Sequence, residues 1–189
     1  MAIVENQPLI RKTIPVWDIG VRLFHWSLVT SVTLSYFVIS PRDMHRFFGY
    51  AVVTLIAFRL IWGLIGPKHA RFSNFIPGPR KLLGYLRDIA RGVEDRYIGH
   101  NPAGAAMIVT LLLVLGAIGT TGYMMGMDAY FGEEWVEDLH KMLVNGLFAL
   151  VAFHLAGVIL ASLRHRVNLI KAMLTGMKEV KSEVNIHNK

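Results

Sequence analysis

Residues 139–157 read LHKMLVNGLFALVAFHLAG, and this stretch decides the fold because it is apolar almost throughout and yet carries two histidines. His140 and His154 are fourteen residues apart. In an α-helix that interval advances about 21 Å and turns through about 1400°, about 40° short of four full turns. The two imidazoles therefore point the same way, at two different depths of one long helix.

Four segments of the chain have the length and character of membrane-spanning helices. The chain has 189 residues, of which 53% are hydrophobic and 17% charged, and its mean hydropathy is +0.43. Residues 21–39, 47–65, 103–125 and 139–163 are each close to the roughly 20 residues that a helix needs to cross a bilayer. The first segment ends in SPRD without a small-residue cleavage site, so we expect it to be retained rather than removed as a signal peptide.

The fold expected from these segments is an all-α integral membrane four-helix bundle. Residues 1–178 would form one domain, followed by a polar tail at 179–189. Residues 79–92, PRKLLGYLRDIARG, place leucines at helical spacing among basic residues and predict an amphipathic helix at the cytoplasmic interface, between the second and third spans. In the following GHNPAG, Asn101 can cap the third span, with Pro102 in its first turn.

Basic residues are concentrated in the N-terminal arm, in residues 67–102 and in the tail, which four crossings place on one side of the membrane. Residues 126–138 contain no Lys or Arg but five carboxylates: Asp128, Glu133, Glu134, Glu137 and Asp138. Loops rich in Lys and Arg remain cytoplasmic, so we expect both termini to be cytoplasmic in a bacterial inner membrane. The net charge of +7 then suits anionic lipid and requires no nucleic-acid partner.

Four of the eight histidines lie in or at the ends of the predicted spans: His25, His45, His140 and His154. An unpaired ionisable side chain is costly inside a bilayer, so such residues are functional candidates. The first span runs outward and the second returns, which sorts the four rings into an inner layer, His25 with His154, and an outer layer, His45 with His140. The other four lie in a loop or the tail, where solvated histidines without a function are expected: His69, His100, His165 and His187.

Two imidazoles that face each other across a bundle can bind one iron ion axially, with a porphyrin supplying four equatorial nitrogens. The apolar runs contain no Asp or Glu, and two distant layers exclude a single four-histidine cage, so two bis-histidine haems fit better than a zinc site or a proton relay. The chain has no cysteine, which excludes thioether attachment. The expected cofactors are therefore two non-covalent b haems. Gly49, Gly146 and Gly157 would leave room for them, whereas Gly116, Gly119 and Gly122 fit close helix packing.

Cationic side chains near each layer are candidate partners for haem propionates. Arg59 follows His45 by fourteen residues, so it faces the same way and lies near the inner layer. Arg59 and Arg22 could serve the inner haem, and Arg46 and Lys141 the outer one. The alternative for the last three is that they only extend toward the membrane surface.

Several motifs together resemble the prokaryotic cytochrome b561 family, which is close to the b-type cytochrome subunits of nickel–iron hydrogenases. They are VWDIGVRLFHW (16–26), HRFFGYAVVTLIAFRLIWGLIGPKHARF (45–72), GHNPAG (99–104) and the spacing from His140 to His154. The resemblance runs from Val16 to about Met177. It implies a four-helix membrane bundle with two b haems, ligated from the first, second and fourth helices, and a quinone or quinol as the redox partner in the membrane.

The expected function is electron transfer between a periplasmic partner and the quinone pool. That partner would be a c-type cytochrome, a dehydrogenase or a hydrogenase. No catalytic residue is predicted, because axial histidines on both faces leave the iron no open position. Arg42, Arg46 and Lys141 near the outer haem keep a superoxide:quinone oxidoreductase as an alternative. A second alternative is a non-redox membrane anchor subunit or transporter, which would show no haem spectrum.

Overall fold

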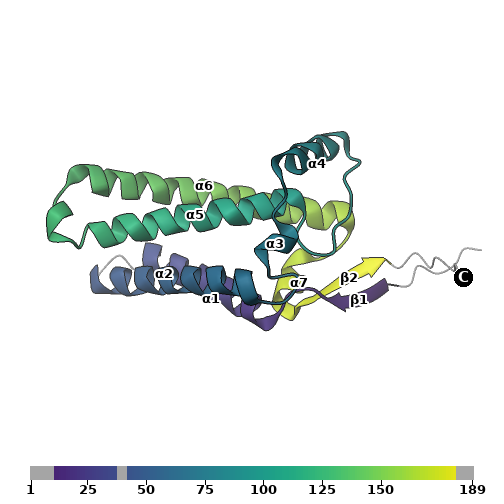
Figure 1. The fold of residues 1–189 in the computed structure, drawn as a ribbon, viewed down its shortest axis with the longest axis horizontal. Coiled ribbons are helices and arrows are strands. Elements are labelled where there is room, and N and C mark those ends of the chain that lie inside the picture. Colours follow the sequence, from purple (N-terminus) through teal and green to yellow (C-terminus); the bar gives the residue numbers. More distant parts are fainter. Residues whose placement is uncertain (1–10, 38–41, 182–189) are drawn as a thin grey trace, which may run out of the picture.

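The structure, a computed structural model, describes residues 11–37 and 42–181 and is built almost entirely of helices (Figure 1). Four long helices run lengthwise: α1 (Ile19–Phe37), α2 (Arg42–Ile65), α5 (Pro102–Met124) and α6 (Glu134–His165). Helix α1 packs along α2 and α5 along α6, and contact between α2 and α5 joins the two pairs. The all-helical prediction is confirmed, and each predicted segment overlaps one long helix; residues 38 and 39 of the first lie outside the described residues.

Shorter elements complete the described chain. They are α3 (Phe72–Phe75), α4 (Pro79–Arg91), α7 (Leu169–Thr175), the 3₁₀ turn η1 (Asp128–Tyr130) and the strands β1 (Arg11–Pro15) and β2 (Met177–Lys181). The two strands pair antiparallel, with Pro15 opposite Met177. This ribbon was not predicted, and it takes in residues 179–181, which the sequence had assigned to the tail. Residues 182–189 lie outside the described part.

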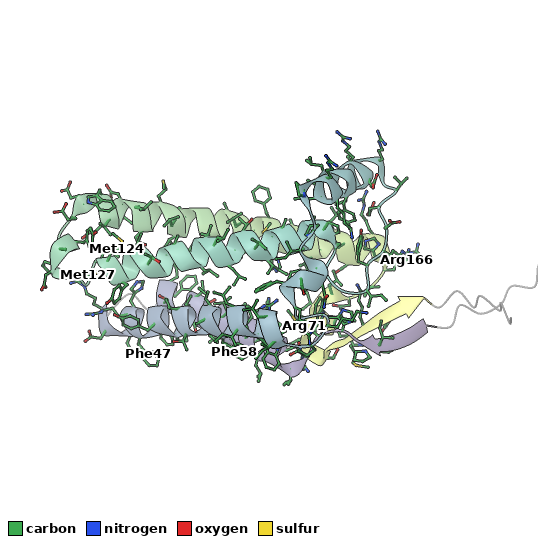
Figure 2. All side chains as sticks on the ribbon, viewed as in Figure 1. Phe47, Phe58, Arg71, Met124, Met127 and Arg166 are labelled. Carbon is green, nitrogen blue, oxygen red and sulfur yellow. The ribbon has the colours of Figure 1, made fainter. Side chains whose placement is uncertain are left out.

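Three of the long helices, α2, α5 and α6, are long and apolar enough to cross a membrane. Over its described residues helix α1 is not among them, and Arg22, His25 and several serine and threonine residues interrupt its apolar sequence. Large apolar side chains face outward along the helices, as Figure 2 shows for Phe47 and Phe58. Only 6% of the most apolar window of α6 is buried within the protein. Something other than this chain's own helices must therefore cover most of the apolar surface of α6.

An apolar cluster lies in the middle of the long helices. Val52 and Ile56 of α2, Leu115 of α5 and Leu147 of α6 are buried against one another. Leu28 and Val32 bring α1 to the same cluster. Because Leu147 lies midway between His140 and His154 on α6, this cluster separates the depths at which those two histidines lie.

The N-terminal arm, the segment with α3 and α4, and the C-terminal segment gather at one end of the long helices (Figure 1). Val16 N donates to Gly176 O at 2.9 Å, and Lys178 Nζ donates to Tyr97 O at 2.7 Å. Arg164, near the end of α6, pairs with Glu94 at 2.9 Å. Three segments far apart in the sequence thus form one end structure.

Asp18 anchors the first long helix. Its Oδ1 accepts a hydrogen bond from Val21 N at 3.2 Å, which caps the start of α1, and a second from Trp62 Nε1 of α2 at 2.9 Å. One carboxylate therefore satisfies a free amide of a helix start and fixes α1 against α2. This contact lies seven residues before His25, at the start of the helix that carries it.

The predicted helix at 79–92 exists as α4, and Asn101 caps α5 as predicted. Asn101 Oδ1 accepts from Gly104 N at 2.7 Å, and Pro102 lies in the first turn. In α4, Tyr85 is buried, whereas Leu83 and Leu86 are 58% and 45% exposed. The helix therefore packs on the protein by one side and leaves an apolar edge exposed.

Candidate functional site

The outer histidines lie together at the end of the bundle that holds the loop between α5 and α6. His45 is in the first turn of α2 and His140 is near the start of α6. Their ring centroids are 6.3 Å apart and the ring planes are inclined by 72°. Since metal–imidazole bonds are about 2 Å long, this separation leaves room for one metal ion between the two rings.

Hydrogen bonds hold both outer rings by their Nδ1 atoms. His45 Nδ1 is 2.8 Å from Ser35 O, a carbonyl that can only accept, so His45 must donate through Nδ1. His140 Nδ1 is 2.9 Å from Thr121 Oγ1. No hydrogen bond of either Nε2 is found within the described residues. In both imidazoles Nδ1 is held by a hydrogen bond and Nε2 is left without one in this part of the chain. This is the arrangement found in histidines that bind metal ions.

The inner histidines come from α1 and α6. His25 and His154 are half-buried and close enough for their charges to interact. His25 Nδ1 is buried without a hydrogen-bond partner in the described chain. An open groove of about 370 Å³ also runs along α1, lined by Trp26, Ser27, Thr30 and Ser31, and His25 is not among its lining residues. A buried polar atom without a hydrogen-bond partner fits a ring that binds a group from outside the chain.

The helix packing leaves one side of the bundle less closed than the others. Helix α1 packs on α2, α2 on α5 and α5 on α6, but α1 and α6 make no contact of similar extent between their described residues. His25 and His154 belong to the two helices that border that side. A flat macrocycle between them would cover apolar surface of α6 that the other helices leave exposed.

Of the three glycines that the sequence assigned to close helix packing, Gly119 and Gly122 contact a neighbouring helix and Gly116 does not, within the described residues. No described atom of another element lies within 4 Å of a Cβ built on Gly49, Gly146 or Gly157, so each faces open space. Gly49 is about one turn after His45 and Gly157 about one turn after His154. A Cβ on Gly119 would lie 2.6 Å from Val53 Cγ2, so this glycine permits close packing of α5 on α2. Gly122 faces the His140 ring in the same way, at 3.4 Å. Gly116 differs from these two, because no described neighbour lies close to it.

Arg59 is turned toward the loop after α2. It is only 2% exposed, its guanidinium donates to Ala70 O at 3.1 Å, and its Cζ lies 4.7 Å from the centroid of the Phe72 ring. Asp18 also attracts its charge. These contacts give the buried cation a structural role in the end of the bundle with the strands. A role for Arg59 toward a haem propionate stays a prediction.

The other three predicted cations have different surroundings. Arg22 donates to the carbonyl of Leu174, and its Nε is buried without a hydrogen bond among the described residues. Arg46 is exposed, with Nη2 3.8 Å from a Cβ built on Gly126. Lys141 lies 3.6 Å from Glu137 and 3.5 Å from Asp138 on its own helix, both exposed pairs. Lys141 is thus surrounded by carboxylates, which weakens its suitability as an anion partner.

The five carboxylates predicted for an outer loop are all exposed. Helix α6 begins at Glu134, so Glu137 and Asp138 belong to its first turns and the loop is shorter than expected. Carboxylates stabilise a helix start through the helix dipole. Glu134 and Glu137 in the first turn, and Glu133 at the N-cap position, therefore have a local structural reason.

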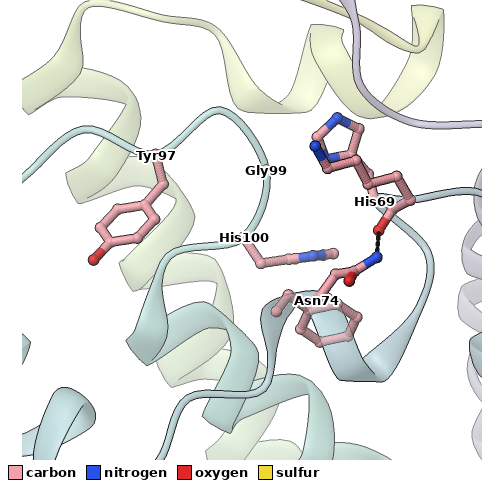
Figure 3. Close-up of a pocket in the computed structure, with 7 residues that line it drawn as sticks. His69, Asn74, Tyr97, Gly99 and His100 are labelled. Carbon is pink, nitrogen blue, oxygen red and sulfur yellow. Dashed lines mark hydrogen bonds between the residues drawn. The ribbon is translucent and has the colours of Figure 1, made fainter.

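The prediction of a solvated loop histidine is wrong for His100. Its ring lies between Trp17 and Phe75, with both ring centroids at 4.5 Å, and its Nδ1 is buried without a partner in the described chain. Burial, with the charges of Arg59, Lys178 and His69, lowers the pKa of His100 to about 3, so the ring is neutral at pH 7. Figure 3 shows His100 with His69, Asn74, Tyr97 and Gly99 around a pocket of about 180 Å³. His165 ends α6, and His187 lies outside the described residues.

Sequence reasoning missed Ser35 and Thr121, which hold the outer histidines. Both are hydroxyl residues in apolar helices, where such side chains commonly bond to carbonyls of their own helix. The available signal was position: Thr121 is in the last turns of the third span, at the depth of His140 near the start of the fourth. That signal identifies a depth but not a contact.

Comparison with known proteins gives a consistent result. A family model described as prokaryotic cytochrome b561 matches residues 16–176. The chain is similar to probable Ni/Fe-hydrogenase B-type cytochrome subunits from three bacteria. For Bradyrhizobium diazoefficiens the identity is 25%, over 89% of this chain and 87% of the relative. For Azotobacter chroococcum and Azotobacter vinelandii it is 26% and 24%, each over 95% of both chains. No solved structure matches the chain.

Proposed function

Because the chain belongs to the prokaryotic cytochrome b561 family, whose proteins are membrane b-type cytochromes of electron transfer, we propose that it binds two b haems and carries electrons across the membrane. The observation that supports this most is the arrangement of two imidazole pairs at two depths along α6. His45 with His140 would hold one haem, and His25 with His154 the other. A bound b haem supplies reversible one-electron exchange at its iron.

The protein's own residues would position and insulate these sites. The Nδ1 hydrogen bonds of His45 and His140 present their Nε2 atoms, and the apolar cluster around Leu115 and Leu147 excludes water between the two depths. Gly49, Gly146 and Gly157 leave space beside the rings. Arg22 and Arg59 are proposed as propionate partners at the inner end and Arg46 and Lys141 at the outer end, although Arg59 and Lys141 already have other partners in the chain.

The finer description of the fold is part of the same proposal. Helix α1 would complete a four-helix membrane bundle with α2, α5 and α6, as one domain over residues 1–178. The end with β1, α4 and β2 would be cytoplasmic in a bacterial inner membrane. There, exposed Leu83 and Leu86 of α4, flanked by Arg80 and Arg87, would contact lipid at the interface.

The redox partners follow from the same arrangement. The relatives are named as hydrogenase subunits, which supports a hydrogenase or another periplasmic redox protein at the outer end. The family resemblance favours quinone or quinol as the partner inside the membrane. The protein would thus be an electron-transfer subunit linking a periplasmic donor or acceptor to the quinone pool.

The test of the haem proposal is stoichiometry and extraction. Purified protein should bind two b haems per chain, and acid acetone should remove both, because the chain has no cysteine for thioether bonds. The pyridine haemochrome spectrum, with protein quantified by amino-acid analysis, measures the ratio. Fully loaded protein with one haem would rule out the two-site arrangement, and protein that binds none would rule out the redox function in favour of an anchor or transporter.

The outer carboxylates provide a second prediction, on the partner. If they form a docking surface, electron exchange with a basic c-type cytochrome should slow roughly tenfold or more as ionic strength rises and the Debye length falls from about 30 Å at 0.01 M to about 10 Å at 0.1 M. Changing Glu133 and Glu134 to Gln should reduce both the rate and its salt dependence. Stopped-flow haem absorbance measures this.

The control removes two carboxylates from the opposite end, Asp88→Asn with Asp95→Asn. Glu137 is left unchanged because it pairs with Lys141. Suppose that the wild type and the Glu133, Glu134 variant exchange electrons at the same rate and with the same dependence on ionic strength. In that case the carboxylates only follow the charge bias of membrane loops. A small-molecule partner such as superoxide at the outer end would then be favoured.

A further inference from the structure

Thr121 of α5 is in direct contact with an outer histidine, although α5 supplies no ligand. Its side chain is buried, with 4% exposed, and Oγ1 lies 2.9 Å from His140 Nδ1. The same Oγ1 lies 3.0 Å from Ala117 O and 3.0 Å from Ile118 O, the carbonyls one turn earlier in α5. Three potential partners therefore surround one hydroxyl group.

The Thr121 hydroxyl is matched to a His140 ring that binds through Nε2. Ala117 O and Ile118 O can only accept hydrogen bonds, so the hydroxyl proton has acceptors on its own helix and the oxygen keeps a lone pair for an Nδ1–H of His140. A neutral imidazole that carries its proton on Nδ1 has its lone pair on Nε2. Thr121 is therefore placed to support the tautomer of His140 that can bind a metal ion through Nε2.

Bonding to the preceding turn does not by itself distinguish Thr121. Thr54, Thr110 and Thr120 each donate to a carbonyl four residues earlier, at 2.9, 3.0 and 2.9 Å. This is a common habit of threonine in apolar helices. Those three side chains are exposed, and no contact between them and a histidine is found in the described structure. Thr121 differs in being buried and in using its oxygen to hold an imidazole.

The two histidine pairs are consequently not equivalent. In the outer pair, both Nδ1 atoms are held, His45 by the Ser35 carbonyl and His140 by Thr121. In the inner pair, His25 Nδ1 has no partner, and no hydrogen bond of His154 is found in the described chain. A hydrogen bond from the second nitrogen of a metal-bound imidazole fixes the ring and makes it a stronger donor, and losing such a partner typically costs about 10- to 100-fold in metal affinity.

We propose that Thr121 is a positioning residue of the outer site: its hydroxyl orients His140, strengthens its donation to iron and so lowers the midpoint potential of the outer haem. A stronger donor stabilises the more positively charged ferric form, which is why the potential falls. The proposal rests on the proposed haem binding and goes beyond it, because it assigns a different environment to each haem.

The experiment compares Thr121→Val, which removes the hydroxyl and keeps the shape, with Thr121→Ser, which keeps the hydroxyl. Thr120→Val is the matched control, because Thr120 has the same bond to the preceding turn but is exposed. Each variant of the full chain is purified with haem bound. Two readouts follow: redox titration of each haem, and the rate of haem transfer to apomyoglobin. The titration is then repeated with each variant combined with His154→Ala, which should remove the inner haem, so that only the outer haem is measured.

Thr121→Val should raise the ferrous-to-ferric ratio of the outer haem about tenfold at a fixed solution potential. For a one-electron couple this corresponds to a rise of about 59 mV in the midpoint potential of that haem. It should also speed transfer of one of the two haems about tenfold. Thr121→Ser and Thr120→Val should behave like wild type. If Thr121→Val does not accumulate in the membrane, Thr121→Ala against Thr121→Ser gives the same comparison.

Suppose that Thr121→Val binds two haems and that the midpoint potential and the transfer rate of both are unchanged. This result would overturn the proposal and leave the proposed function intact. A shift of equal size in Thr120→Val would also overturn it, because the effect would then come from α5 in general. Failure of the proposed function has a different signature, which is the absence of two haems from the wild-type protein.

Discussion

Replacing His154 with alanine should remove one haem and leave the other nearly unchanged, whereas His140→Ala should remove the opposite one. Each substitution deletes one axial nitrogen of one pair. The apolar cluster with Leu147 and about 21 Å of helix separate the two depths. The reduced α band should therefore fall to about half in each variant, with different residual maxima and potentials. Optical redox titration of purified protein measures both.

The pairing is tested by the partner residues. His25→Ala should reproduce the spectrum of His154→Ala, and His45→Ala that of His140→Ala. His165→Ala is the control, since it removes an imidazole from the end of the same helix. In His154→Gly, added imidazole should restore the missing component if that side chain acts as a ligand. Identical spectral losses in His25→Ala and His45→Ala would show that the pairs are wrongly assigned.

Filling the space beside the inner pair should have an effect of similar size. Gly157 is exposed, and no described atom of another element lies within 4 Å of a Cβ built on it, so a larger side chain meets no obstacle in the protein itself. We expect Gly157→Leu to leave the fold and the outer haem in place and to remove the inner haem, because leucine would occupy the space of the macrocycle. Haem content, together with thermal unfolding followed by circular dichroism, measures both consequences.

The control for this substitution is Gly116→Leu. Gly116 is also a glycine of a membrane-crossing helix that has open space around it, but it is not within a turn of a proposed ligand. It should retain two haems. Should Gly157→Leu also bind two haems with unaltered spectra, the macrocycle does not lie against this part of α6.

Much of the fold could be predicted from the sequence because it depends on local regularities. The 3.6-residue period places His140 and His154 on one face of α6, and length with composition identifies the long helices. The cap at Asn101 also follows from neighbouring residues. An even number of crossings brings the three basic segments to one end. These arguments need no knowledge of how the helices are rotated against one another.

The remaining features depend on contacts between distant segments, which a sequence pattern does not specify. The bond from His140 to Thr121 requires the relative height of α5 and α6 to within a few ångströms. His100 is buried because Trp17 and Phe75 come to either side of it, although its own neighbours in sequence look like a loop. The β ribbon joins two short, largely polar segments from opposite ends of the chain, and neither has a strong strand pattern alone.

The contact between the first helix and the last segment also fixes an order of assembly during synthesis. Arg22 bonds to the carbonyl of Leu174, which follows it by 152 residues. At about 5–20 residues per second, the ribosome needs about 8–30 s to make that stretch. Throughout this interval the start of α1 is held by the contact of Asp18 with Trp62 of α2, and the ribbon of β1 with β2 cannot exist. The bond to Leu174 is therefore made late, so a chain cut before residue 174 would contain all four paired histidines and still lack this second clasp at the start of α1.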